Sequence, residues 1–298
     1  MITRRQLLAL VILSLMWGVN WPMMKLSLRE MSPLYFRALT MSVGSVFLFT
    51  WFRAQGLRMM PQGREWRSVV ALGLPNMLGW HALSILAVKE LASGRAAILG
   101  FTMPIWTVLL GVLFLGEKLT RRVAFASVCV AVVIALLISH EFTALAGRPL
   151  GIVWIEIAAL IWAIGTLMMR RSTLTLPVAT LTVWMMILSS ACLWVIAGLA
   201  EPWPQWQFSP TTWASLAYGA FINYGLAQTL WADLARKLPP VTSVMGITAV
   251  PLIGTMTATF IVGEWPHWQD YVAIVFVMAA MAAVLLPPHF FRRIKVTA

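Results

Sequence analysis

The chain has 298 residues, of which 60% are hydrophobic and 11% charged, and its formal net charge is +12. A soluble domain carries about 45–50% apolar and about 25% charged residues, so the composition excludes an ordinary soluble protein and predicts an integral membrane protein. The basic residues form short clusters between apolar runs, which argues against a nucleic-acid-binding surface.

Apolar runs of membrane-spanning length follow one another along the whole chain. A helix needs about 20 residues to cross the hydrocarbon core. Helices are expected because a segment of this length must satisfy its own backbone hydrogen bonds inside the bilayer. The all-α fold is expected to have ten transmembrane helices, over residues 6–24, 33–52, 66–88, 93–115, 121–140, 150–169, 177–200, 212–234, 240–262 and 268–287.

The loops between these helices differ in charge from one side of the membrane to the other. With the N-terminus inside, sixteen Lys and Arg residues lie on one side and five on the other. Basic residues accumulate in cytoplasmic loops, so both termini are expected in the cytoplasm.

A Pro followed by a Gly-Glu pair occurs in both halves of the chain. Pro104 and Pro251 are 251 − 104 = 147 positions apart, and Glu117 and Glu264 have the same offset. A fixed offset of half the chain indicates a duplication. Five helices are an odd number, so the second copy is expected to be inverted in the membrane, as in many secondary transporters. The sequence therefore predicts two five-helix repeats, residues 1–143 and 148–298, in one transport domain.

Glycines and prolines interrupt four central helices at corresponding places of the two halves. Such residues serve helix packing or act as hinges, and both interpretations remain open. The candidate hinge residues are Gly73, Pro75, Gly79, Gly100, Pro104, Gly219, Gly225, Gly246, Pro251 and Gly254.

Amide, imidazole and aromatic side chains occur at membrane depth in the same central helices. A buried amide without a partner is costly, so these groups either join helices or face a wet cavity. Indole rings with a few amides suit a small amphipathic solute. The candidate cavity residues are Trp17, Asn20, Trp21, Asn76, Trp80, His81, Met103, Trp162, Asn223, Tyr224 and Gln228.

Charge inside the predicted helices is scarce: Arg37 lies near the outer end of helix 33–52, and Glu156 about two turns into helix 150–169. Charges inside a membrane are functional candidates, although snorkelling or pairing of these two with each other is an equal alternative. Glu117 and Glu264 are expected to cap the helix that follows each of them. No catalytic or metal-binding motif is recognisable, and no cofactor is expected.

The inverted five-helix repeats and the Pro…Gly-Glu pattern resemble the drug/metabolite transporter superfamily, and within it the ten-helix EamA-type exporters. Trp17-Gly18-x-Asn20, Pro104 before Gly116-Glu117, and Pro251 before Gly263-Glu264 carry this resemblance. The chain looks most like bacterial aromatic-amino-acid exporters, which implies a multi-pass protein of the inner membrane. The resemblance also implies a central cavity shared by both halves and lined by Trp162. Met103 departs from the aromatic residue expected before Pro104.

The sequence thus predicts a secondary transporter that exports amino acids, aromatic or large neutral ones, and related metabolites by alternating access. Export of drugs or other small metabolites by the same fold is the alternative, and an intramembrane enzyme or a channel is more remote. The expected partners are a small-molecule substrate and the lipid bilayer. A monomer is one of the open possibilities for the assembled state.

Overall fold

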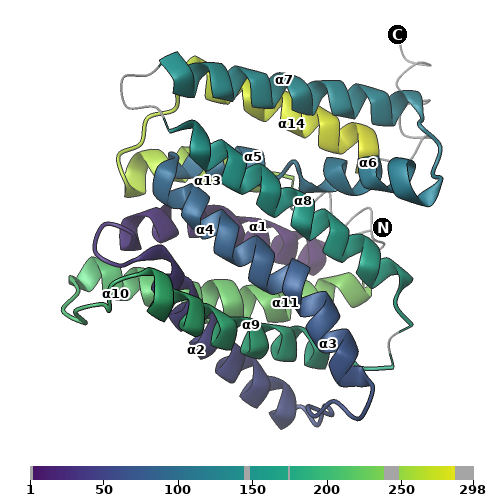
Figure 1. The fold of residues 1–298 in the computed structure, drawn as a ribbon, viewed down its shortest axis with the longest axis vertical. Helices are drawn as coiled ribbons and strands as arrows, with labels where there is room; N and C mark the ends of the chain where they lie inside the picture. Colours follow the sequence, from purple (N-terminus) through teal and green to yellow (C-terminus); the bar gives the residue numbers. More distant parts are fainter. Residues whose placement is uncertain (1–2, 144–147, 174, 238–247, 286–298) are drawn as a thin grey trace.

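The computed structural model describes residues 3–143, 148–173, 175–237 and 248–285, and every regular element in these ranges is a helix (Figure 1). Seven of the described helical segments are long and apolar enough to cross a membrane. Large apolar side chains on the outer surfaces of the described helices are exposed, including Leu199 at 85% and Phe260 at 83% exposure. Such surfaces are stable in contact with lipid, and in water they would form extensive apolar patches.

Five helices run without interruption and agree with the predicted runs. They are α1 (Arg4–Ser27), α2 (Pro33–Ala54), α7 (Arg121–Thr143), α8 (Pro149–Arg171) and α9 (Val178–Ala200). Proline is among the first residues of both α2 and α8, where its missing N–H would have no helical partner.

The predicted helix at residues 66–88 is continuous, but its middle is a π-helix. The segment consists of α3 (Glu65–Gly73), η1 (Leu74–Gly79) and α4 (Trp80–Glu90). Pro75 has no N–H to donate to the preceding turn, and this loss favours a local change in hydrogen-bond register.

A second π-helix occupies the corresponding place in the second half. Here α10 (Pro210–Ala217), η2 (Tyr218–Leu226) and α11 (Ala227–Lys237) follow one another without a gap. Adding 147 to the bounds of η1 gives 221–226, which lies within η2. The two irregular stretches therefore share the offset of the sequence repeat.

The predicted helix at 93–115 is broken in two. Its parts are α5 (Ser93–Gly100) and α6 (Met103–Leu115), and the chain turns at Phe101 and Thr102. Pro104 is the second residue of α6, where it cannot extend the hydrogen bonds of α5. Likewise, Pro251 is the second residue of α13 (Val250–Ile261), which precedes α14 (Trp268–Leu285). The start of the predicted helix 240–262, with Gly246, lies outside the described residues.

The Gly-Glu pairs end α6 and α13 in the same way. Gly116 and Gly263 have φ of 70° and 76°, a left-handed conformation that glycine adopts without a Cβ penalty. The N–H of Glu117 then donates to the carbonyl of Gly111 (3.2 Å), and that of Glu264 to the carbonyl of Ala258 (3.3 Å). The repeated Gly is thus explained by a helix end that requires it.

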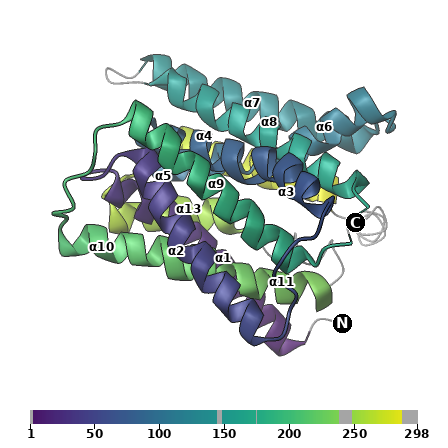
Figure 2. The same cartoon turned by 60° about the horizontal axis from the view of Figure 1, so that its bottom comes forward.

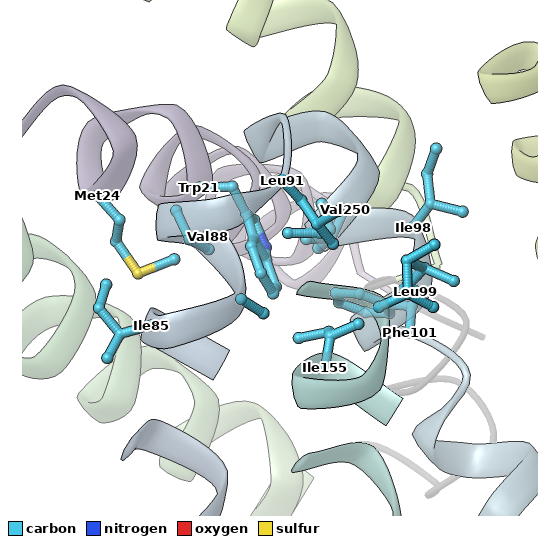
Figure 3. Packing of buried hydrophobic residues seen from close by; sticks show 14 of the residues in the cluster. Trp21, Met24, Ile85, Val88, Leu91, Ile98, Leu99, Phe101, Ile155 and Val250 are labelled. Carbon is cyan, nitrogen blue, oxygen red and sulfur yellow. The ribbon is translucent and has the colours of Figure 1, made fainter. Parts of the chain in front are cut away.

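The helices pack mainly as pairs. α2 lies against α9, α7 against α14, α1 against α13 and α4 against α8. Figure 1 shows α7 and α14 side by side on one flank, with α2 and α9 on the other. Figure 2 shows α7 along one edge and α10 and α11 toward the opposite edge. In Figure 3 the indole of Trp21, from α1, lies among apolar side chains of α4, α5, α8 and α13. The core therefore joins helices from both halves of the chain.

Candidate functional site

Three polar side chains from three different helices form a buried chain of contacts. Arg37 of α2 donates from Nη1 to the hydroxyl of Tyr224 in η2 (2.9 Å), and this hydroxyl lies 3.1 Å from Nδ1 of His81 in α4. Arg37 and Tyr224 are 2% and 1% exposed, whereas His81 is half-buried. The contacts bring together two predicted cavity residues, His81 and Tyr224, and one predicted membrane charge.

Pairing of Arg37 with Glu156, one of the alternatives that the sequence left open, is not found in the structure. In the described part of the chain, the other hydrogen bond of the Arg37 guanidinium runs from Nη2 to the thioether of Met24 (2.9 Å). Its Nε is buried and has no hydrogen-bond partner in the described part of the chain. Arg37 points toward α1 and η2, while Glu156 binds residues at the break between α5 and α6, and this arrangement separates the two charges.

Glu156 is anchored by two neutral donors. Its carboxylate accepts from Nε1 of Trp106 (2.8 Å) and from the hydroxyl of Thr102 (3.2 Å). Thr102 belongs to the turn between α5 and α6. The acid of α8 therefore fixes the point at which the neighbouring helix is interrupted.

The three predicted asparagines lie in the interior, at 7–8% exposure. Asn76, in η1, donates from Nδ2 to the carbonyl of Leu72 (2.9 Å) and lies directly against Gly165 of α8. Asn223 occupies η2, and Asn20 lies in α1. Asn76 thus serves a local contact between η1 and α8.

Indole rings gather around α1. Trp17 packs against Trp231 of α11, with ring centroids 5.6 Å apart. Trp21 and Trp80 both reach Gly100, where an added Cβ would lie 2.9 Å from one ring and 3.3 Å from the other. The end of α5 therefore accepts two indoles because it carries no side chain.

The remaining predicted cavity residues are half-buried. Trp162 lies in α8, Gln228 in α11, and Met103 begins α6. Ile161, next to Trp162, packs against Gly79 of η1. The contact of Ile161 places this turn of α8 beside the π-helical stretch of the first half.

The predicted hinge residues coincide with irregular backbone or with close helix crossings. Gly73 ends α3, and Gly100 ends α5. Gly254 of α13 lies against Ala97 and the backbone of Gly18. The residues in π-helices or at the second position of a helix are Pro75, Gly79, Gly219, Gly225, Pro104 and Pro251.

Glu264 does not cap the helix that follows it, contrary to the prediction. Its carboxylate accepts from the backbone N–H (2.7 Å) and hydroxyl (2.6 Å) of Ser93 at the start of α5. Asp270 supplies the cap of α14 by accepting from the N–H of His267 (2.8 Å). Glu117 lies 3.6 Å from Arg170, at the end of α8. The helix packing brings Glu264 next to a helix of the other half.

A buried ionic cluster was not predicted from the sequence. Arg95 of α5, 5% exposed, binds both carboxylate oxygens of Asp270 (2.8 and 3.1 Å) and also contacts Glu141. His140 Nδ1 lies 3.1 Å from the same guanidinium. These residues fall at the ends of apolar runs, so the only signal in the sequence is a set of opposite charges next to predicted helix ends.

A family model of known transporters matches nearly the whole chain, in two stretches. The EamA-like transporter family matches residues 4–139 and 149–286. The chain belongs to this family. Its members are transporters, and the described helices of suitable length and hydropathy show a multi-pass membrane protein.

Relatives with similar sequences cover almost the full length. The uncharacterized transporter YoaV of Bacillus subtilis is 20% identical over 92% of both chains, and the uncharacterized inner membrane transporter YedA of Escherichia coli is 23% identical over 96% of this chain and 94% of its own. A protein of Salmonella typhimurium named probable amino-acid metabolite efflux pump is 25% identical over 92% of both. A solved crystal structure aligns at a TM-score of 0.68 and 20% identity over 99% of both chains, which shows the fold alone.

Proposed function

We propose that this EamA family member exports amino acids, aromatic or large neutral ones, and related metabolites across the bacterial inner membrane by alternating access. The observation that carries the proposal is a set of amide, imidazole, phenol and indole groups at membrane depth among α1, α4, α8 and η2. Such groups can bind both ends of an amphipathic solute. The relative named as an amino-acid metabolite efflux pump and the relative named as an inner membrane transporter support the substrate class and the membrane.

The proposed pathway runs between two inverted five-helix repeats, residues 1–143 and 148–298, with both termini in the cytoplasm. Three pairs of features support this division, each at the same offset: the π-helices η1 and η2, the prolines that begin α6 and α13, and the left-handed glycines at the ends of these two helices. The family model also matches the chain in two successive stretches. The interface between repeats is where transporters of this design bind substrate.

The irregular helices are the proposed moving parts. A π-helical stretch or a chain break leaves fewer α-helical hydrogen bonds to be broken when a helix bends. These interruptions lie in both halves, so bending one set opens the cytoplasmic side and bending the other opens the outer side.

The experiment that tests this function is counterflow in proteoliposomes. Purified protein is reconstituted with unlabelled phenylalanine inside, and uptake of labelled phenylalanine, tryptophan, threonine and methionine is measured at equal pH on both sides. Saturable uptake that is lost in a folded Trp162→Ala variant supports an amino-acid carrier with Trp162 in its cavity. Absence of uptake for all four solutes rejects the amino-acid assignment.

The alternatives predict different results in the same vesicles. An exporter of drugs or other metabolites gives counterflow only with those solutes. A channel gives uptake that does not saturate and shows no counterflow. A membrane enzyme gives a chemically altered product, which mass spectrometry of the recovered solute detects.

A further inference from the structure

Arg37 is a buried positive charge that forms no ion pair with a carboxylate in the described part of the chain. All ten Asp and Glu residues of the chain lie in its described part, and none of the ion pairs found there includes Arg37. The guanidinium is 2% exposed and lies within α2, inside an apolar segment. An isolated charge in this environment is strongly unfavourable.

The contrast with Arg95 shows that this arrangement is specific to Arg37. Arg95, 5% exposed, is matched by two carboxylates, Asp270 and Glu141. Arg37 has a phenol and a thioether instead, and its Nε has no hydrogen-bond partner among the described residues. The guanidinium of Arg95 is thus paired with carboxylates within the fold, whereas that of Arg37 has an N–H donor at Nε without an acceptor among the described residues.

The direction of the hydrogen bonds adds a second donor at the same place. A guanidinium can only donate, so the oxygen of Tyr224 accepts from Arg37. In the tautomer of His81 that is unprotonated at Nδ1, the Tyr224 hydroxyl donates to that nitrogen, 3.1 Å away. A neutral His81 that accepts at Nδ1 carries its own proton on Nε2. The imidazole is half-buried and then offers this N–H as a second donor beside Arg37.

The three residues are also coupled to the irregular helices. Tyr224 is part of η2, and His81 follows η1 after one intervening residue. A shift of η2 therefore moves the Tyr224 hydroxyl relative to Arg37, and a shift of η1 moves the His81 imidazole.

We propose that Arg37, with His81 beside it, binds the carboxylate of the transported solute, which replaces Tyr224 and Met24 as partner of the guanidinium. A carboxylate supplies the missing negative charge and can accept two parallel N–H bonds from one guanidinium. The phenol of Tyr224 holds the guanidinium while no carboxylate is bound. The inference rests on the proposed export of amino acids and names the solute group that this site recognises.

The test compares two analogues of phenylalanine that each lack one charged group. The first, 3-phenylpropionate, keeps the carboxylate, and the second, phenethylamine, keeps the ammonium. In counterflow with labelled phenylalanine, 3-phenylpropionate should compete at least about ten-fold better than phenethylamine. Equal competition, or better competition by phenethylamine, overturns the proposal while leaving amino-acid transport in place.

Variants at Arg37 test whether this residue causes the preference for the carboxylate analogue. Arg37→Gln should raise the KM for phenylalanine about ten-fold or more and remove the competitive advantage of 3-phenylpropionate over phenethylamine. Arg37→Lys keeps the positive charge and should retain part of that advantage. A purely structural role would reduce the amount of folded protein or the maximal rate and leave the ranking of the two competitors unchanged. That unchanged ranking in folded Arg37→Gln protein overturns the assignment.

A binding measurement separates this inference from the proposed function. The thermal unfolding midpoint of detergent-solubilised protein is recorded with either analogue, in the wild type and in Arg37→Gln. Stabilisation by 3-phenylpropionate alone, lost in Arg37→Gln, supports the carboxylate site even if no amino acid shows counterflow. Stabilisation by neither analogue, or equal stabilisation of both proteins, overturns it.

Discussion

Asn76 and Asn223 lie 147 positions apart, and each is buried within a π-helical stretch of its own half. Regular α-helix is the lower-energy backbone for apolar segments, and π-helical turns occur mostly as short insertions at functional sites. Two such insertions at matching positions indicate that both central helices need the same local geometry.

The crossing of α5 and α13 depends on the absence of a side chain at Gly94. A Cβ there would lie 2.8 Å from the Cα of Thr255, so the backbone of α13 would have to move. We expect Gly94→Ala to destabilise the protein by about 1–3 kcal/mol, measured as a lower thermal midpoint in detergent. The matched control is Gly198→Ala in α9, where the nearest atom is the hydroxyl of Tyr35 at 3.8 Å. A midpoint for Gly94→Ala equal to that of the control would contradict the close crossing.

The buried cluster around Arg95 should be sensitive to the loss of one acid. Asp270→Asn leaves the guanidinium with Glu141 alone and weakens the start of α14. Breaking a buried pair costs about 3–5 kcal/mol, so a large drop in the thermal midpoint is expected. Glu90→Gln removes the partner of Arg148, which is 59% exposed, and should change stability by less than about 1 kcal/mol. Similar effects of the two variants would show that the Arg95 cluster contributes little.

How far the sequence predicts this fold depends on the kind of interaction. Length and hydropathy locate the long helices to within a few residues because burial in lipid acts on each segment separately. Proline marks the π-helical stretch at Pro75 and the helix starts at Pro104 and Pro251, since it removes a backbone hydrogen bond wherever it lies. A π-helix without a proline, as in η2, has no comparable signal in the sequence.

Contacts between distant side chains were less predictable. Arg37 and Glu156 are complementary in charge, but helix packing directs Arg37 to Tyr224 and Glu156 to Trp106. Glu264 reaches Ser93 for the same reason. Pairing of this kind depends on which helix faces meet, and apolar helices with lipid on one side show little periodicity to indicate their faces.

Acid should weaken the connection between the first loop and α10. Two hydrogen bonds from Ser209, from its hydroxyl (2.5 Å) and its N–H (2.8 Å), hold the pKa of the Glu30 carboxyl below the ordinary 4.5. A lowered pKa in the folded state stabilises the protein above about pH 4.5, and this contribution is lost as the pH falls through the folded pKa. Glu30→Gln cannot be protonated, so its thermal midpoint should fall less than that of the wild type on acidification. Parallel curves for the two proteins would refute the contribution of Glu30.

The breaks before α6 and α13 are expected to permit bending during transport. In Pro104→Ala the new N–H can donate to the carbonyl of Gly100 and join α5 to α6. We expect the double variant Pro104→Ala/Pro251→Ala to fold and to transport at least about ten-fold more slowly. Pro210→Ala is the control because Pro210 is the first residue of α10, where a backbone N–H has no intrahelical carbonyl to donate to. Unchanged rates in the double variant would remove the hinge role.

The central claim, that this chain is an amino-acid exporter, is tested most directly by counterflow of labelled phenylalanine into proteoliposomes preloaded with the unlabelled amino acid. We expect transient, saturable accumulation of label that requires internal phenylalanine and disappears in folded Trp162→Ala protein. Uptake that is no faster than in protein-free vesicles, for phenylalanine and for tryptophan, threonine and methionine as well, would contradict it.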